Sequence, residues 1–225
     1  LEQACAAPTP TDAAPHRETP EDSPQVLLLS EAQREIWVAC QMSPDATRAY
    51  NESHTLRLRG PLDVSALDAA IGDLVATHEA LRLVISPDGR SQTVRPRVAL
   101  DVAGSDLSTV PESQRQSRLE ALIDDITNLA FDLQEGPLVR FHLVKTAIHE
   151  HHLVFAAHHV TCDGWSLDVL LSDLGALYRA RREGRTLRLE RPPLARYVAW
   201  DEAQREDREA DLAWWTARHL SLIHI

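Results

Sequence analysis

The stretch AHHVTCDGWS, residues 157–166, decides how this chain folds. It follows an apolar run, residues 153–157, and it precedes a run whose apolar residues recur at helical spacing. This pattern predicts a buried strand, a tight loop, and a helix that starts directly after the loop. Such a connection brings two histidines, a carboxylate and the free backbone N–H groups of a helix start close together. We therefore expect the chemistry of the chain at this loop.

The bulk composition excludes several classes of protein. The chain has 225 residues and 44% hydrophobic residues, enough for one large domain or two small ones with a packed core. A net charge of -11 argues against a nucleic-acid partner, which would need a basic face. No apolar run has the length of a membrane span. Cys5, Cys40 and Cys162 are widely separated and odd in number, which favours a reducing, cytoplasmic setting over a disulfide framework.

The two ends of the chain differ in composition from its middle. Residues 1–25 are rich in Ala, Pro, Thr, Asp and Glu without apolar periodicity, so we expect a disordered linker between domains. Residues 26–219 are the expected folded region. The tail 220–225 fits no preceding pattern and resembles a translated sequencing adaptor, so we expect it to be non-native. A chain that begins with Leu is expected to be a piece of a longer protein.

Periodicity between these ends predicts an α+β fold. Ser30 and Gln33 have the spacing of a capping box, which predicts a helix start. Strands are expected over 53–58, 81–85, 92–98, 138–145 and 152–157, the last covered on both faces because its residues are continuously apolar. Helices are expected over 67–78, 111–129 and 167–184, with a last helical region around 197–215. This order predicts helices packed on a mixed, largely antiparallel sheet.

Four segments resemble, in the right order, the motifs of condensation domains in nonribosomal peptide synthetases. Residues 158–166 resemble the HHxxxDG signature, and residues 30–37 (SEAQREIW) resemble the opening SxAQxRxW motif. Residues 78–82 (HEALR) resemble the RHExLR motif, although Thr77 stands where the family has its first Arg. Residues 197–200 (YVAW) resemble a later aromatic motif.

The resemblance implies a fold and a reaction. Condensation domains have two lobes, each similar to chloramphenicol acetyltransferase, with a tunnel between them. The motifs present match the N-terminal lobe only, so residues 26–219 would be that lobe, and the C-terminal lobe and an adenylation domain would lie in the same polypeptide. The reaction is amide formation between an acyl or peptidyl thioester and an aminoacyl thioester, in secondary metabolite or antibiotic biosynthesis. Both substrates would be carried on phosphopantetheine of partner carrier domains, and the lobe itself would bind no cofactor or metal.

The resemblance also assigns roles within the loop. His159, the second histidine of the signature, is the expected catalytic residue, because a histidine can take the proton of the attacking amine or position that amine. His158 is expected to be packed and hydrogen-bonded. Asp163 is expected to be structural and to pair with Arg82. Gly164 would let substrate approach the backbone, whose N–H groups would stabilise an oxyanion.

Other residues near the loop admit more than one interpretation. Trp165 and Ser166 are expected to contact substrate. Cys162 invites a thiol nucleophile, but a small buried hydrophobic residue is the ordinary role. The histidines of 149–152 suit a polar hairpin turn better than a metal site, since strand alternation separates neighbouring side chains. The arginines of 179–188 favour a solvated helix end, or the docking of an acidic carrier domain.

Alternative functions remain within and beyond this family. Asn51-Glu52-Ser53 and residues 162–165 resemble condensation domains that follow polyketide modules, which implies a polyketide donor. An epimerization domain shares HHxxxDG, but its following residues usually differ from Trp165-Ser166. A cyclization domain would have aspartate in place of the histidines. A stand-alone CoA-dependent acyltransferase and a catalytically incomplete carrier-binding fragment are further alternatives, the latter because half a tunnel cannot exclude water.

Overall fold

The computed structural model describes residues 23–43 and 45–219. Of the expected linker over residues 1–25, residues 1–22 lie outside the described part of the chain. The expected tail, residues 220–225, lies wholly outside it. Both therefore stay predictions. Gln25, the last residue of the expected linker, already begins the first strand, β1 (Gln25–Leu28).

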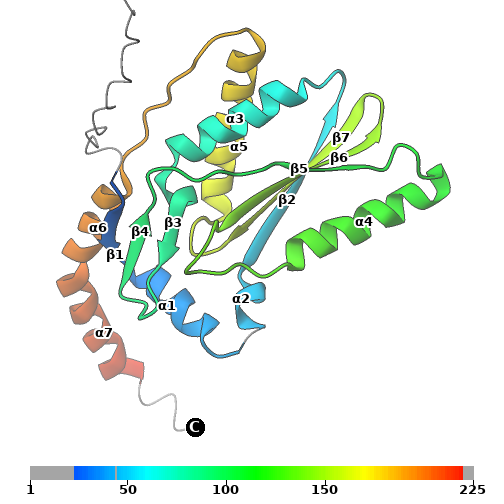
Figure 1. Cartoon of the computed structure of the whole chain (residues 1–225). Helices are drawn as coiled ribbons and strands as arrows, with labels where there is room; N and C mark the ends of the chain where they lie inside the picture. Colours follow the sequence, from blue (N-terminus) through cyan, green and yellow to red (C-terminus); the bar gives the residue numbers. More distant parts are fainter. Residues whose placement is uncertain (1–22, 44, 220–225) are drawn as a thin grey trace, which may run out of the picture.

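A mixed sheet forms the centre of the fold (Figure 1). Its spatial order is β2 (Asn51–Arg59), β7 (Glu150–His158), β6 (Val139–Ala147) and β5 (Ala103–Asp106). β7 is antiparallel to both of its neighbours, β2 and β6, whereas β5 is parallel to β6. The prediction of a mixed, largely antiparallel sheet is therefore confirmed. β5 itself was not predicted, because its four residues, Ala-Gly-Ser-Asp, have neither apolar alternation nor β-branched side chains.

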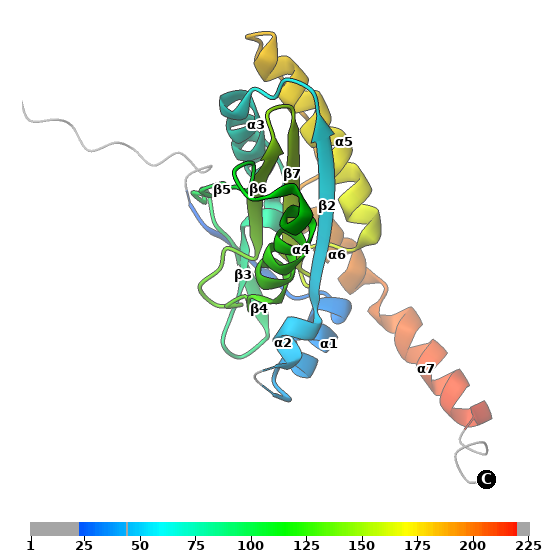
Figure 2. The same ribbon diagram turned by 90° about the vertical axis from the view of Figure 1, so that its right-hand side faces the viewer.

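Helices cover both faces of this sheet. α3 (Val64–Thr77) and α5 (Gly164–Arg182) pack side by side on one face, and α4 (Glu112–Asn128) packs on the other (Figures 1 and 2). On β7, Leu153 and Phe155 pack toward α3 and α5, while Val154 packs toward α4. The prediction that this strand is buried on both faces is confirmed. Its end, where the histidines follow, is held rigidly because a buried strand has no freedom to shift.

A smaller sheet lies beside the end of β7 that leads to the histidine loop. It has the order β1, β4 (Ser91–Val94) and β3 (Leu83–Ile85), all antiparallel. The predicted strand 92–98 ends at Val94, because Pro96 has no N–H to donate to a ladder. Gly89 in the β3–β4 turn has φ of +63°, and a Cβ there would lie 2.3 Å from the ring of Trp37. This turn therefore requires glycine, and it seats α1 (Glu31–Cys40) against the small sheet.

The remaining helices surround the small sheet or extend from it. These are α2 (Ala46–Ala49), the 3₁₀ turn η2 (Glu79–Arg82), α6 (Leu194–Ala203) and α7 (Arg205–His219). α7 runs away from the body of the molecule (Figure 2). From the sequence, Trp200, Trp214 and Trp215 are most simply explained as core or lobe packing. They are 58%, 50% and 55% exposed, so they are not part of the core of the described residues, and packing against another lobe stays a prediction. Among the described residues, no helix is long and apolar enough to cross a membrane.

Candidate active site

The loop between β7 and α5 is held by short-range hydrogen bonds. The N–H and the Oγ1 of Thr161 both donate to the carbonyl of His158, each over 2.9 Å. At the far end, Asp163 is the N-cap of α5 and accepts hydrogen bonds from the N–H and the Oγ of Ser166, at 2.7 and 2.6 Å. These bonds satisfy the Ser166 N–H in the first turn of the helix and fasten the loop to the start of α5.

His158 is fully buried at the start of the loop. Its Nδ1 accepts from the N–H of Val160 at 3.2 Å, and its Nε2 faces the Sγ of Cys40 at 3.7 Å. The edge of the His158 ring meets Phe131. Burial lowers the pKa of His158 to about 4, so the ring is neutral near neutral pH. A neutral ring with both nitrogens engaged shapes the loop and has no access to substrate.

His159, the next residue, is partly exposed and oriented by the loop. Its N–H donates to the carbonyl of Tyr50 at 2.8 Å, and its ring stacks on that of Tyr50. The ring Nδ1 lies 3.0 Å from the carbonyl oxygen of Cys162. Because a carbonyl oxygen can only accept, Nδ1 must donate, and the neutral ring keeps its lone pair on Nε2. This is the tautomer that a proton acceptor needs.

An open cleft of about 430 Å³ lies beside His159. The loop lines it together with residues from the start of α1, from η2 and β3, and from α6, among them Ser30, Ile36, Leu83, Leu194 and Tyr197. The cleft thus brings together residues from all four sequence motifs that point to the family, with Ala80 from HEALR and Tyr197 from YVAW. Among the described residues, apolar and small polar side chains form one wall of the cleft, next to the partly exposed ring of His159.

Gln33 connects the opening motif to the loop. Its Nε2 donates to the carbonyl of Val160 at 3.2 Å and to Oε1 of Gln92 at 2.9 Å, and its Oε1 accepts from Nε2 of Gln92 at 2.8 Å. Gln33 also completes the predicted capping box with Ser30. The sequence singled out Gln33 as a cap and as a member of the opening motif, but not as a contact of the loop. Its hold on the loop depends on a fully buried amide, Gln92, that carried no local signal.

Arg82 does not pair with Asp163, contrary to the prediction. Its guanidinium donates instead to backbone carbonyls, at 3.1 Å to Val75 and 3.1 Å to Pro96, and also to Ala76 and Arg95. It therefore caps the end of α3 and ties it to the chain after β4. Asp163 has its own local partner in Ser166, which explains why it needs no distant arginine.

The rest of the HEALR segment is equally occupied by structural contacts. His78 Nε2 donates to the buried carboxylate of Asp173 at 2.8 Å, which also receives Nε of Arg191 at 2.9 Å. Glu79 accepts from the N–H of Leu194 at 2.6 Å, at the start of α6. Burial lowers the pKa of His78 even though Asp173 favours the charged form. The segment fastens α3, α5 and α6 together.

The residues after the loop separate in space. Ser166 lines the cleft, whereas Trp165 is 83% exposed and borders a different hollow next to Asp168 and Arg191. A Cβ added to Gly164 would meet nothing within 4 Å. The fold itself thus tolerates a side chain at Gly164, and a need for glycine there would come from a ligand.

Cys162 is buried, and its surroundings disfavour a nucleophilic role. Burial raises the pKa of the Cys162 thiol to about 11. The thiolate is the nucleophilic form, so the sulfur is unreactive near neutral pH. The ordinary role as a small buried hydrophobic residue fits the structure, because Cys162 packs in the core between α5 and the sheet.

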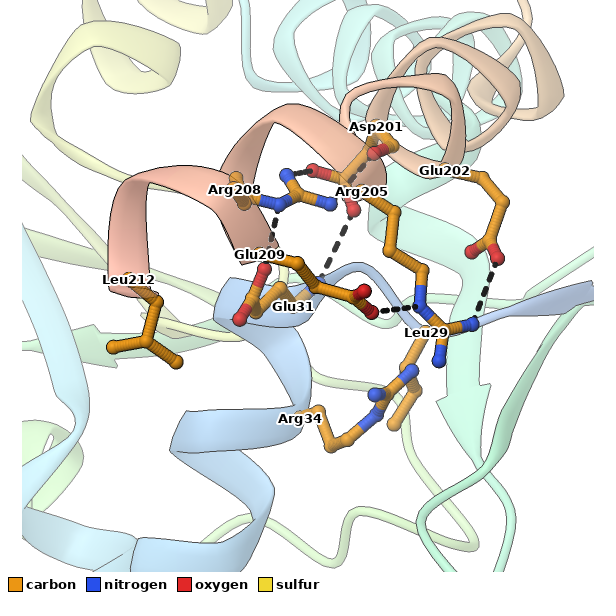
Figure 3. A pocket seen from close by; sticks show the side chains of 9 residues that line it. All are labelled: Leu29, Glu31, Arg34, Asp201, Glu202, Arg205, Arg208, Glu209 and Leu212. Atoms are coloured by element: carbon orange, nitrogen blue, oxygen red, sulfur yellow. Dashed lines mark hydrogen bonds and ion pairs between the residues drawn. The ribbon is translucent and has the colours of Figure 1, made fainter. Parts of the chain in front are cut away.

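Another hollow, of about 340 Å³, lies between the start of α1 and the helices α6 and α7 (Figure 3). Its acidic side chains pair with Arg205 and Arg208. Arg208 reaches Asp201 at 2.8 Å and Glu31 at 2.8 Å, and Arg205 reaches Glu209 at 3.4 Å (Figure 3). The carboxylate of Asp201 also accepts from the N–H of Glu31 at 3.2 Å. These pairs hold α7 to α1, so this hollow is a structural junction.

The α/β sandwich and its histidine loop are those of a chloramphenicol acetyltransferase-like lobe. The chain belongs to the condensation domain family, whose profile matches residues 23–222. It is 33% identical over 204 residues to chondramide synthase cmdD of Chondromyces crocatus, covering 89% of this chain and 5% of that protein. It is 32% identical to phosphinothricin tripeptide synthetase PhsB of Streptomyces viridochromogenes, covering 97% of this chain and 19% of that protein.

Solved condensation domains share the fold. The first condensation domain of the calcium-dependent antibiotic synthetase superposes with a TM-score of 0.75 at 26% identity, over 86% of this chain and 47% of that one. The starter condensation domain of rhizomide synthetase RzmA gives a TM-score of 0.75 at 24% identity, over 87% of this chain and 48% of that one. The chain thus spans about half the length of these domains and a small part of the synthetases that it matches.

Proposed function

We propose that this chain is the N-terminal lobe of a condensation domain that forms amide bonds in nonribosomal, or mixed polyketide–peptide, biosynthesis. The donor would be an acyl or peptidyl thioester and the acceptor an aminoacyl thioester, each on the phosphopantetheine of a carrier domain. The carrier domains, the C-terminal lobe and an adenylation domain would be partners of this lobe, which itself needs no cofactor for the reaction. Family membership supports this proposal. The free cysteines Cys40 and Cys162 agree with a cytoplasmic setting.

The observation that carries the proposal is the orientation of His159. Its Nδ1 donates to the Cys162 carbonyl at 3.0 Å, so Nε2 is the basic atom of a ring that lines an open cleft. An α-amine is largely protonated near neutral pH, and only its neutral form attacks a carbonyl. A ring that accepts a proton from the amine, or from the zwitterionic adduct that the amine forms, favours the reaction.

The proposed reaction balances without any other reactant. The amine nitrogen adds to the thioester carbonyl, and the adduct loses a proton from nitrogen to Nε2 of His159. The C–S bond then breaks, and the leaving sulfur takes the proton from Nε2 of His159, which leaves an amide, a free thiol and the neutral ring. Backbone N–H groups at the start of α5, next to Gly164, would stabilise the negative oxygen of the adduct. The cleft would add proximity by holding the two tethered groups together.

The test uses the intact synthetase with donor and acceptor carriers loaded. Mass spectrometry of the acceptor carrier should detect the amide-linked product with the wild-type protein and lose it with His159→Ala. Chiral analysis of the released product separates condensation from epimerization, which would give inverted stereochemistry without a new amide. A wild-type synthetase that binds loaded carriers, yet forms neither product, would identify this lobe as a carrier-binding fragment and overturn the proposal.

A further inference from the structure

Glu52 lies directly beside the ring of His159. It sits on β2, where it is paired in register with Ala157 of β7, and its Oε1 is 3.5 Å from Nδ1 of His159. The side chains of Glu52 and His159 are 40% and 35% exposed. Glu52 stands more than a hundred residues before His159 in sequence and belongs to none of the four motifs. The pair therefore exists only because β2 and β7 are neighbours.

The backbone around Glu52 is fixed on both sides. The preceding Tyr50 accepts the N–H of His159 through its carbonyl at 2.8 Å. The Nδ2 of Asn51 donates to the carbonyl of Thr127 at 2.7 Å and to that of Leu129 at 3.1 Å, which ties β2 to the end of α4. Because strand and loop are both anchored, the carboxylate is held at the ring by the fold itself.

The other groups that face His159 contribute less charge. The carboxylate of Asp163 is engaged by Ser166, and the same hydrogen bonds lower the pKa of Asp163. His158 is neutral near pH 7, because burial lowers its pKa to about 4. The Cys162 thiol stays protonated, since burial raises its pKa to about 11. Tyr50 contributes a ring face. Glu52 is thus the carboxylate placed closest to Nδ1.

We propose that Glu52 is a positioning residue for the condensation reaction, an inference that rests on the proposed function of His159. With the Cys162 carbonyl, the carboxylate keeps the proton of the neutral ring on Nδ1 and the lone pair on Nε2. It also stabilises the positive ring that exists after His159 has taken a proton. Glu52 does not line the cleft beside His159, so it acts through the ring and not on the substrate in that cleft.

The first test measures the ring in the 225-residue chain, without any turnover. Nitrogen-15 NMR of the imidazole follows the pH at which His159 is half protonated. In Glu52→Gln this pH should fall by about half a unit to one unit, because a unit charge about 4 Å away contributes about 1 kcal/mol in a water-like surrounding. Glu150→Gln is the matched control, since Glu150 lies at the far end of β7 and pairs with Arg57. An unchanged midpoint in Glu52→Gln overturns the proposal.

The second test measures catalysis by the intact synthetase. Glu52→Gln should lower kcat about fivefold, leave KM for the loaded acceptor carrier unchanged, and move the acidic limb of the pH–rate profile to lower pH. Glu52→Asp should recover part of the loss. A raised KM with unchanged kcat would mean that Glu52 binds substrate, which overturns the positioning role. If His159→Ala retains full activity, the proposed function fails, whereas the NMR result stands independently.

Discussion

The histidine loop, residues 158–163, and the HEALR segment, residues 78–82, look alike in sequence. Both contain a histidine, an acidic residue and family-like spacing. In the structure, however, His78 is largely buried against the carboxylate of Asp173 and Glu79 holds the start of α6, while His159 is 35% exposed and lines the cleft. Reactive residue types therefore mark a site only where the fold turns them toward a cleft.

The largest expected effect is a difference between His159 and His78 in what their loss changes, the reaction rate or the stability. In the intact synthetase, His159→Ala should lower the rate of amide formation by about a hundredfold or more, the usual contribution of a proton-transfer group. Its melting temperature should stay within about 2 °C, because the ring is partly exposed. His78→Ala should do the reverse, with a clear loss of melting temperature and a nearly normal rate per folded molecule. Equal changes of rate and of melting temperature in the two variants would contradict a catalytic role for His159 and a structural role for His78.

A second prediction concerns how the free energy of unfolding depends on pH through the buried His158. Burial lowers the pKa of His158 from 6.5 to about 4. The unfolded chain therefore binds a proton at this residue between pH 6.5 and 4 that the folded chain excludes, so stability falls as the pH falls. The contribution is present above pH 6.5 and amounts to about 3 kcal/mol lost by pH 4.

The measurement is urea unfolding of the chain at pH 7 and pH 4. Burial also lowers the pKa of His78, His142, His151 and His152, so the wild-type loss includes their contributions. His158→Asn keeps an acceptor for the Val160 N–H but cannot titrate in this range. It should be less stable than wild type at pH 7 and lose less stability toward pH 4. An identical pH dependence in wild type and His158→Asn would contradict the buried, neutral ring.

The third prediction concerns Asp173, the buried carboxylate that binds His78 of the HEALR segment. Burial alone would raise the pKa of Asp173, but hydrogen bonds from Arg191 and His78 lower it overall. Asp173→Asn should cost about 2–3 kcal/mol of unfolding free energy, because it leaves Arg191 without its anion. This loss corresponds to about 5–10 °C in melting temperature. Asp168→Asn, on the exposed side of the same helix, is the control and should change little. The wild-type contribution is present above about pH 4 and lost below it.

Much of the fold followed from local pattern. The apolar faces of α3, α4 and α5 follow from spacing, since residues three or four apart lie on the same face of a helix. The capping box follows from spacing too, because Ser30 and Gln33 stand three residues apart. β1 and β5 escaped prediction because they are four-residue strands defined by their neighbours and not by their own side chains. The exposure of Trp214 and Trp215 on α7 does not follow from the sequence, because it depends on where the helix points.

The site was predictable only where its bonds are short-range. His159 stands out through its motif, and the cap that Asp163 forms with Ser166 could have been recognised from the three-residue spacing. The partner predicted for Asp163, Arg82, was wrong because nothing in the sequence shows that four backbone carbonyls surround this guanidinium. Glu52 reaches the ring of His159 from a neighbouring strand, and Gln92 acts on the loop only through Gln33, which no local pattern reveals.

The smallest expected effect concerns the role of Asp163 as the N-cap of α5. As an N-cap, Asp163 should contribute about 1 kcal/mol, lost in Asp163→Ala and largely retained in Asp163→Ser and Asp163→Asn, which also cap. Hydrogen bonds from Ser166 lower the pKa of Asp163, so this contribution is present above about pH 4 and disappears below it. Chemical unfolding of the three variants at pH 7 and pH 3 measures both statements.

A double-mutant cycle separates the cap from the ion pair with Arg82. Arg82→Met alone should be destabilising, because it frees the carbonyls at the end of α3. If Asp163 is only a cap, the losses of Arg82→Met and Asp163→Ala should add within about 0.5 kcal/mol, as expected for residues without shared partners. A coupling well above that value would restore the ion pair and would make Asp163, like His78 and Glu79, a fastener between distant elements.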